Sequence, residues 1–358
     1  MHELTSSHWL ILPLFLCASA CSDGSGTRDR VDTETESDSD ADTSTATGSE
    51  SNSTDADSDT DPDDSASETG DACGDGIAAR YPQDIGIEAD TDVIFADDFE
   101  GYGDASALST LWNDGVYHNV EIVSAPSPVF VGEKALRFHV PQQDAELSNT
   151  VAALLPEEED MVYLRFYSRF DASFDVVGSS HNGGGMSAHY YVNGQATPGV
   201  PADGTNKFLA SMEWWRGTEE EPSPGSLNVY VYHPEQRIEY GDHFFPDGTV
   251  LPWTYLPGDF GPDFIARENQ VPDVDRWYCH ELMVKANTPG ERDGRISMWV
   301  DGELVADFGN LRLRDVDTLK INRVSLSLHI GSNTRSETWK WFDNVVVARA
   351  YIGPVCNP

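Results

Sequence analysis

Short runs of apolar residues that alternate with polar ones recur from about residue 95 to the end of the chain. These runs are rich in Val, Ile, Tyr, Phe and Trp and are bounded by Gly, Pro, Asn and Asp, a pattern typical of β-strands joined by turns. Strands are predicted at 119–124, 135–140, 161–170, 207–215, 226–232, 277–285, 295–300, 323–330 and 341–348. Helical periodicity is nearly absent. Many strands without crossover helices predict an all-β sandwich or jelly roll.

The N-terminus has a different pattern. An apolar run at 9–20 has the length of a signal-peptide core and is too short to cross a bilayer. Ala-Ser-Ala at 18–20 precedes Cys21, and small residues before a cysteine resemble the lipobox of bacterial lipoproteins. The resemblance implies a signal peptide at 1–20, lipidation of Cys21, and anchoring by lipid alone in the outer membrane or at the cell surface. An ordinary cleaved signal peptide is the alternative.

Residues 21–72 are almost entirely Ser, Thr, Asp, Glu, Gly and Ala. Such a segment cannot bury enough apolar surface to offset the entropy of ordering it, so it is predicted to be a disordered, extended linker. It carries about 15 negative charges, 17 acidic residues less two arginines, of the net charge of −40. The rest of the chain is also acidic, which argues against nucleic acid as a partner.

One folded domain is predicted at 73–358, because no second linker or internal repeat interrupts it. It is expected to be a monomer. Cys73 and Cys356 lie at its two ends, which in many domains are close together, so a disulfide between them is predicted for an exported protein. Cys279 lies in a strand-like run and is expected to be a buried thiol. Other pairings stay open.

Three segments resemble the concanavalin A-like jelly rolls of polysaccharide lyases, in particular the alginate- and glucuronan-lyase type. They are Asp-Asp-Phe-Glu at 97–100, the stretch 276–305 with an Asn-Thr-Pro-Gly turn at 287–290 and a Trp-Val-Asp-Gly turn at 299–302, and Phe-Asp-Asn-Val-Val-Val at 342–347. The resemblance implies a concanavalin A-like jelly-roll sandwich. It also implies cleavage of a uronate-containing polysaccharide by β-elimination, with no cofactor required.

The resemblance implies catalytic roles for Tyr230 and Tyr232, which alternate on one strand and so face the same side. The family's Gly-Gly-Lys loop corresponds to a glycine-rich stretch here that has no lysine. That stretch supplies His181 and Asn182 as further catalytic candidates, with His181 as a base. The glycines at 183–185 are expected to give this loop freedom to close on a ligand.

The family's serine and arginine fall on Ala210 and Met212 in the simplest register, or on Ser211 and Glu213 after a slip of one residue. Six residues are candidates for substrate binding: Glu213, Trp215, Arg216, Glu281, Lys285 and His189. One concave face is expected to carry Tyr230, Tyr232, Glu213 and Glu281, with the loop of His181 over its rim.

Two other functions compete with the lyase. A glycoside hydrolase needs two carboxylates on either side of the scissile bond, and Glu213 and Glu281 are the candidates. A non-catalytic carbohydrate-binding module would stack its tryptophans on sugar faces. Asp98, Glu100 and Asp343 are candidates for a structural calcium ion, because the first and last strands that carry them are expected to be neighbours.

Overall fold

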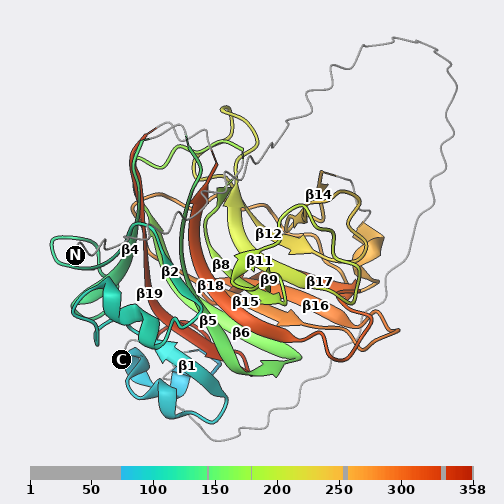
Figure 1. Ribbon diagram of the computed structural model, residues 1–358, viewed down its shortest axis with the longest axis horizontal. Helices are drawn as coiled ribbons and strands as arrows, with labels where there is room; N and C mark the ends of the chain where they lie inside the picture. The colour runs from blue at the N-terminus through green and yellow to red at the C-terminus, as the bar shows by residue number, and fades with distance from the viewer. Residues whose placement is uncertain (1–73, 143–144, 179, 253–256, 332–335, 357–358) are drawn as a thin grey trace, which may run out of the picture. The chain divides into compact units, whose positions relative to one another are not determined.

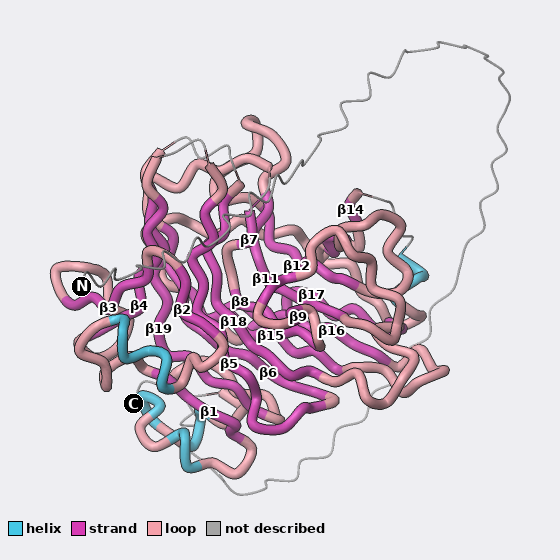
Figure 2. Tube along the Cα trace, in the orientation of Figure 1, coloured by secondary structure: helices cyan, strands magenta, loops and turns pink. Residues whose placement is uncertain are grey.

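The computed structural model describes residues 74–142, 145–178, 180–252, 257–331 and 336–356. Nearly all of its regular structure is β, arranged as two antiparallel sheets packed face to face (Figures 1 and 2). The predicted all-β jelly-roll sandwich is therefore confirmed. The signal peptide at 1–20, Cys21, the linker and Cys73 lie outside the described residues.

Sheet A runs, in spatial order, through β17 (Glu303–Leu311), β16 (Gly294–Val300), β15 (Tyr278–Lys285), β6 (Met161–Phe170), β19 (Thr338–Ala348), β4 (Lys134–Val140) and β3 (Val120–Ser124), and β1 (Val93–Asp97) also pairs with β19. Sheet B runs through β14 (Val250–Leu251), β13 (Asp242–Phe244), β12 (Ser226–Tyr232), β11 (Phe208–Trp215), β8 (Gly184–Ala188), β18 (Ile321–Ile330), β5 (Leu147–Glu159) and β2 (Gly115–Tyr117), and β7 (Ser180–His181) also pairs with β18.

Short elements complete the described chain. β9 (Tyr191–Val192) and β10 (Gln195–Ala196) form a separate two-stranded hairpin. The 3₁₀ turns are η1 (Ala78–Arg80), η2 (Pro82–Asp84), η3 (Ile87–Ala89), η4 (Ala105–Thr110) and η5 (Pro257–Phe260). Within the part of the chain that the structure describes, no helix is long and apolar enough to cross a membrane.

The hydrophobic core fills the space between the sheets, and the alternation of β11 shows how the sequence directs side chains to or away from it. Phe208, Ala210, Met212 and Trp214 are buried in the core. Successive side chains of a strand point to opposite faces, so the remaining residues of β11, Ser211 and Glu213 among them, face away from the core. The sequence left two registers open for the family's serine and arginine. The register slipped by one residue places them on Ser211 and Glu213, which lie on the outer face of sheet B.

The N-terminal segment of the domain packs on the outer face of sheet A. Arg165 on β6 is fully buried there. It forms an ion pair with Asp84 of η2, and its Nη2 also donates to the backbone oxygen of Asn344, at 3.1 Å. Ile77 donates its backbone N–H to the oxygen of Tyr351, at 3.1 Å. The first described residues therefore lie beside the C-terminal segment. A disulfide between Cys73 and Cys356 requires the two ends of the domain to be close in this way, and it stays a prediction.

Candidate functional site

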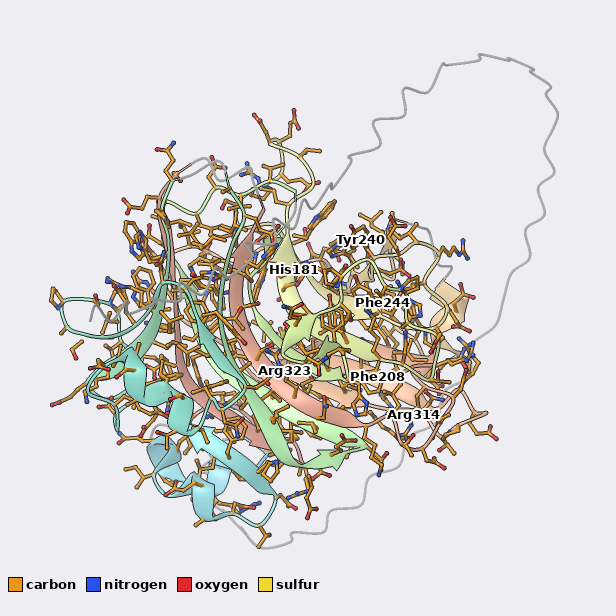
Figure 3. All side chains as sticks on the ribbon, viewed as in Figure 1. His181, Phe208, Tyr240, Phe244, Arg314 and Arg323 are labelled. Carbon is orange, nitrogen blue, oxygen red and sulfur yellow. The ribbon has the colours of Figure 1, made fainter. Side chains whose placement is uncertain are left out.

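The outer face of sheet B carries a cluster of titratable side chains that come from five strands. His181 on β7, Glu213 on β11, Tyr230 on β12, His243 on β13 and His329 on β18 gather there. The ring of His181 lies 4.7 Å from that of Tyr230 and 5.4 Å from that of His329, centroid to centroid. Tyr230 in turn lies 4.8 Å from His243. Figure 3 labels His181 near the upper end of this face.

His181 and Glu213 form the centre of the cluster. Nδ1 of His181 lies 2.9 Å from Oε2 and 3.2 Å from Oε1 of Glu213. The carboxylate is fully buried, whereas 35% of the His181 side chain is exposed. Among the described residues, Nε2 of His181 has no hydrogen-bonding partner. A buried carboxylate therefore holds one nitrogen of an accessible imidazole, an arrangement that orients a histidine to act as a base through its other nitrogen.

The environment shifts the pKa values of both partners. Burial lowers the pKa of His181, but the charge of Glu213 and the hydrogen bond to it outweigh burial, so the net pKa lies above the ordinary 6.5. Burial raises the pKa of Glu213 above its ordinary value, and His181 offsets this only in part. The pair thus holds a proton between its two members more tightly than either group would alone.

The other two histidines are uncharged at neutral pH. Burial, and then the charge of His181, lower the pKa of His243 to about 3 and that of His329 to about 3. Nδ1 of His243 lies 2.9 Å from Oδ1 of Asn228. The amide nitrogen of Asn228 already donates to backbone oxygens, so His243 donates from Nδ1. Its Nε2 is then a hydrogen-bond acceptor.

Tyr230 and Tyr232 lie on the outer face, as their alternation predicts, in a cluster with Tyr190 that is separate from the core. The hydroxyl of Tyr230 accepts a hydrogen bond from the backbone N–H of Gly241 at 2.9 Å, and that of Tyr232 accepts one from the backbone N–H of Gly199 at 3.4 Å. Burial, and then Tyr232, hold the pKa of Tyr230 well above 10, so this hydroxyl stays protonated. Tyr232 is fully buried, and its ring centroid lies 5.6 Å from that of Tyr230, edge to face.

The glycine-rich stretch around His181 is not a flexible loop. Gly184–Ala188 is β8, a buried strand between β11 and β18. A Cβ on Gly183 would lie 1.9 Å from the backbone oxygen of Met212, and one on Gly184 would lie 2.4 Å from the ring of Phe166. Glycine is therefore required here for close packing, and the prediction of freedom to close on a ligand is wrong.

Asn182 lies next to His181 but points into the structure. It is fully buried, and its side chain donates to Ser180 Oγ and to the backbone oxygen of Trp214 and accepts from the N–H of Trp214. Its own backbone oxygen accepts a hydrogen bond from the buried Lys340. The structure thus gives Asn182 the role of holding the strand of His181 in place, in contrast to the predicted catalytic role.

Glu281 and Lys285 lie on β15 of sheet A, so the prediction that Glu281 shares a face with Glu213 is wrong, and Lys285 lies away from the cluster. Glu281 is buried, and its carboxylate accepts the backbone N–H groups of Ile352 and Gly353 at 2.8 and 2.9 Å. The C-terminal segment covers it, and the core separates it from Glu213. The two carboxylates therefore cannot flank one glycosidic bond, and the predicted hydrolase pair has no geometric basis.

Glu281→Gln should change how stability depends on pH. Burial raises the pKa of Glu281 from 4.5 to about 7 in spite of its two N–H donors. Between these values the folded protein binds more protons than the unfolded chain, so the free energy of unfolding falls as pH rises. In the unchanged protein this decrease in the free energy of unfolding should be on the order of 3 kcal/mol. We expect it to be missing in the Gln variant. Urea unfolding at acidic and neutral pH measures it, and an unchanged pH dependence would contradict the assignment.

The remaining predicted binding residues lie at the edge of the cluster or away from it. Trp215 faces outward beside His243, with centroids 5.4 Å apart. Arg216 is buried and is held by Asp175 and by the backbone oxygens of Glu219 and Glu221, so it is a structural arginine. His189 is exposed and contacts Glu158 at 3.0 Å.

The candidate calcium ligands accept hydrogen bonds from the backbone. Asp98 accepts from the N–H of Glu100, Glu100 from Glu133 and Lys134, and Asp343 from Phe130 and Asn344. Over the described residues, no three His, Cys, Asp or Glu side chains come together in a way that could hold a metal ion. The calcium site therefore gains no support and stays a prediction.

A cavity of about 350 Å³ opens between the sheets and is lined by Trp214, Tyr278, His280 and the segment 268–272. It lies on the core side of β11, whereas Glu213 points to the opposite side. Burial holds the pKa of His280 well below its usual value, so this histidine is uncharged. The paired groups that general acid–base chemistry needs are on the outer face of sheet B, which we take as the candidate site for that reason.

Sequence reasoning missed His243 and His329. Each occupies an outward position on its strand, next to Phe244 and Leu328 in the core. Alternation along these strands is the signal that marks them as outward-facing, but it does not say which strands are neighbours in the sheet. The pairing of β7 with β18, in which His181 lies opposite His329, comes only from the structure.

Solved alginate lyases share this fold. The alginate lyase Aly36B matches with a TM-score of 0.52 and 17% identity, over 73% of this chain and 98% of that one. The alginate lyase vAL-1 from a Chlorella virus gives 0.52 and 17%, over 72% and 100%. A third, from Aplysia kurodai, gives 0.50 and 14%, over 72% and 99%. No family model and no curated protein matches the sequence. At these identities the likeness establishes the fold, so the chain is similar in architecture to alginate lyases.

Proposed function

We propose that the outer face of sheet B is the active site of a polysaccharide lyase that cleaves a uronate-containing glycan by β-elimination. The observation that carries the proposal is the accessible His181 held by the buried Glu213 beside the protonated Tyr230. The fold shared with alginate lyases supports it, and so does a variant of Aly36B in complex with an alginate tetrasaccharide.

In the proposed reaction, Nε2 of His181 removes the proton from C5 of the uronate. The C5–H electrons form the C4–C5 double bond, and the bond between C4 and the leaving oxygen O4 breaks. O4 then needs a proton, which we assign to the hydroxyl of Tyr230, whose ring centroid lies 4.7 Å from that of His181. The proton on His181 returns to Tyr230 through solvent, so the enzyme is unchanged after each turnover.

Glu213→Gln should shift the pH dependence of the reaction. The charge of Glu213 holds the pKa of His181 above its usual value against the effect of burial. Without that charge burial dominates and the pKa falls, so the rising limb of the pH–rate profile should move to lower pH. The plateau should drop roughly tenfold or more, because the carboxylate also orients the imidazole. A profile of kcat against pH tests this. If the rising limb of the profile lies at the same pH in the variant, Glu213 does not set the pKa of the catalytic base.

A panel of uronate polymers and neutral glycans tests the proposed function. Ultraviolet absorbance of an unsaturated sugar end identifies a lyase product. Binding to a glycan column without any turnover on the panel would instead identify a carbohydrate-binding module, and would overturn the proposal.

We also propose that the mature protein is tethered by lipid at Cys21 and is displayed at the outer membrane or cell surface. The apolar run at 9–20 and the small residues before Cys21 support this. Cys21→Ser should move the protein from the membrane fraction to the soluble fraction. If the unchanged protein and the Cys21→Ser variant divide between the membrane and soluble fractions in the same way, the proposed lipid anchor is contradicted.

A further inference from the structure

The charges around His181 restrict which uronate the site can use, and the inference drawn here rests on the proposed lyase function. When a base removes the proton from C5 of a uronate, negative charge develops on the neighbouring carboxyl group. If that group is already an ionised carboxylate, a second negative charge builds up on it. A site for ionised uronates therefore needs a cation or a free amide to stabilise the transition state. The amides of Asn182 and Asn228 already donate to backbone oxygens.

Over the residues that the structure describes, the outer face of sheet B instead presents negative charge near His181. The Glu213 carboxylate lies directly behind the imidazole, fully buried. Oε1 of Glu146, at the end of the face, lies 3.9 Å from Nδ1 of His329. His329 and His243 are uncharged at neutral pH, because burial lowers the pKa of each to about 3.

Two basic side chains of the described chain near the site, Lys207 just before β11 and Arg323 on β18, are already engaged. Nζ of Lys207 is buried, donates to Thr197, and lies 4.4 Å from the ring centroid of Tyr232. Arg323 forms an ion pair with Asp114, and its guanidinium lies 3.5 Å from the ring of Tyr191. Figure 3 labels Arg323 on this sheet, apart from His181.

The geometry points to a substrate whose uronate carboxyl groups are neutral, that is, a 4-linked polyuronate ester. An ester carbonyl acidifies the C5 proton without carrying a charge, so elimination builds one negative charge where the free acid would build two. The neutral ester also meets no repulsion from Glu213 or Glu146. Hydrogen-bond donors suffice for the single charge, and Ser211 on β11 supplies a hydroxyl group on the same face.

A matched pair of substrates tests this inference. One polyuronate of fixed chain length is prepared as the free acid and as its methyl ester, and the protein is assayed on each by absorbance of the unsaturated product. We expect kcat/KM to be roughly tenfold or more higher on the ester. A blank with His181→Gln corrects for spontaneous elimination of the ester.

Variants separate charge from catalysis. Glu213→Gln should lower the rates of cleavage of both the ester and the free acid. It should also reduce the ratio of kcat/KM on the ester to kcat/KM on the acid, because the carboxylate that repels the acid is gone. Glu121→Gln, an exposed carboxylate on sheet A, should leave the ratio unchanged. Equal or faster cleavage of the free acid would overturn the ester inference and leave the lyase proposal standing. Cleavage of neither form, across polymers of different uronates, would overturn both.

Discussion

His181→Gln is expected to abolish most of the lyase activity while the protein still binds glycan. General-base catalysis by a positioned side chain contributes about 10²–10⁴-fold, so kcat should fall by that factor. Glutamine keeps a polar group of similar length next to Glu213 but has no basic nitrogen. Initial rates of double-bond formation, together with a binding isotherm on the same glycan, measure the two effects separately.

A matched control is available in His189→Gln. His189 is exposed and pairs with Glu158 away from the cluster, so its loss should leave kcat unchanged. If His181→Gln retains full turnover, the base lies elsewhere. If it loses binding as well as turnover, His181 contributes to substrate affinity and the assignment as a base loses its basis.

Asp84→Ala should be the most destabilising single substitution among the ion pairs described above. Arg165 is fully buried, and Asp84 is its only carboxylate partner among the described residues. Removing Asp84 leaves a buried guanidinium uncompensated, which typically costs about 3–5 kcal/mol of unfolding free energy. Urea unfolding at neutral pH measures the change.

Glu121→Ala is the comparison for Asp84→Ala. Glu121 pairs with Arg137 on the exposed outer face of sheet A. Exposed pairs contribute about 0–1 kcal/mol, so this variant should unfold almost as the unchanged protein does. A similarly small loss for Asp84→Ala would show that the N-terminal segment does not depend on the buried pair.

Local pattern predicted much of the fold. Alternation on β12 placed Tyr230 and Tyr232 on one side of their strand, and the structure has both there, in a cluster separate from the core. No strand was predicted anywhere in β5 (Leu147–Glu159), and its run of glutamates at 157–159 lacks the apolar alternation of a core strand.

The candidate site was less predictable, because it depends on contacts between distant segments. Glu281 has the alternation of an outward residue, but only the structure shows that the chain near Ile352 folds back over it. The glycines before Met186 have the composition of a flexible loop and are instead needed where β8 packs against β11. Composition does not distinguish these two uses of glycine.

The most direct test of the central claim is a comparison, in one reaction, of new double bonds with new reducing ends. Each elimination at an internal linkage creates one C4–C5 double bond and one reducing end. A lyase acting through His181 on the outer face of sheet B should therefore give the two in equal numbers, and His181→Gln should lower both together. New reducing ends without double bonds would show hydrolysis and would contradict the account.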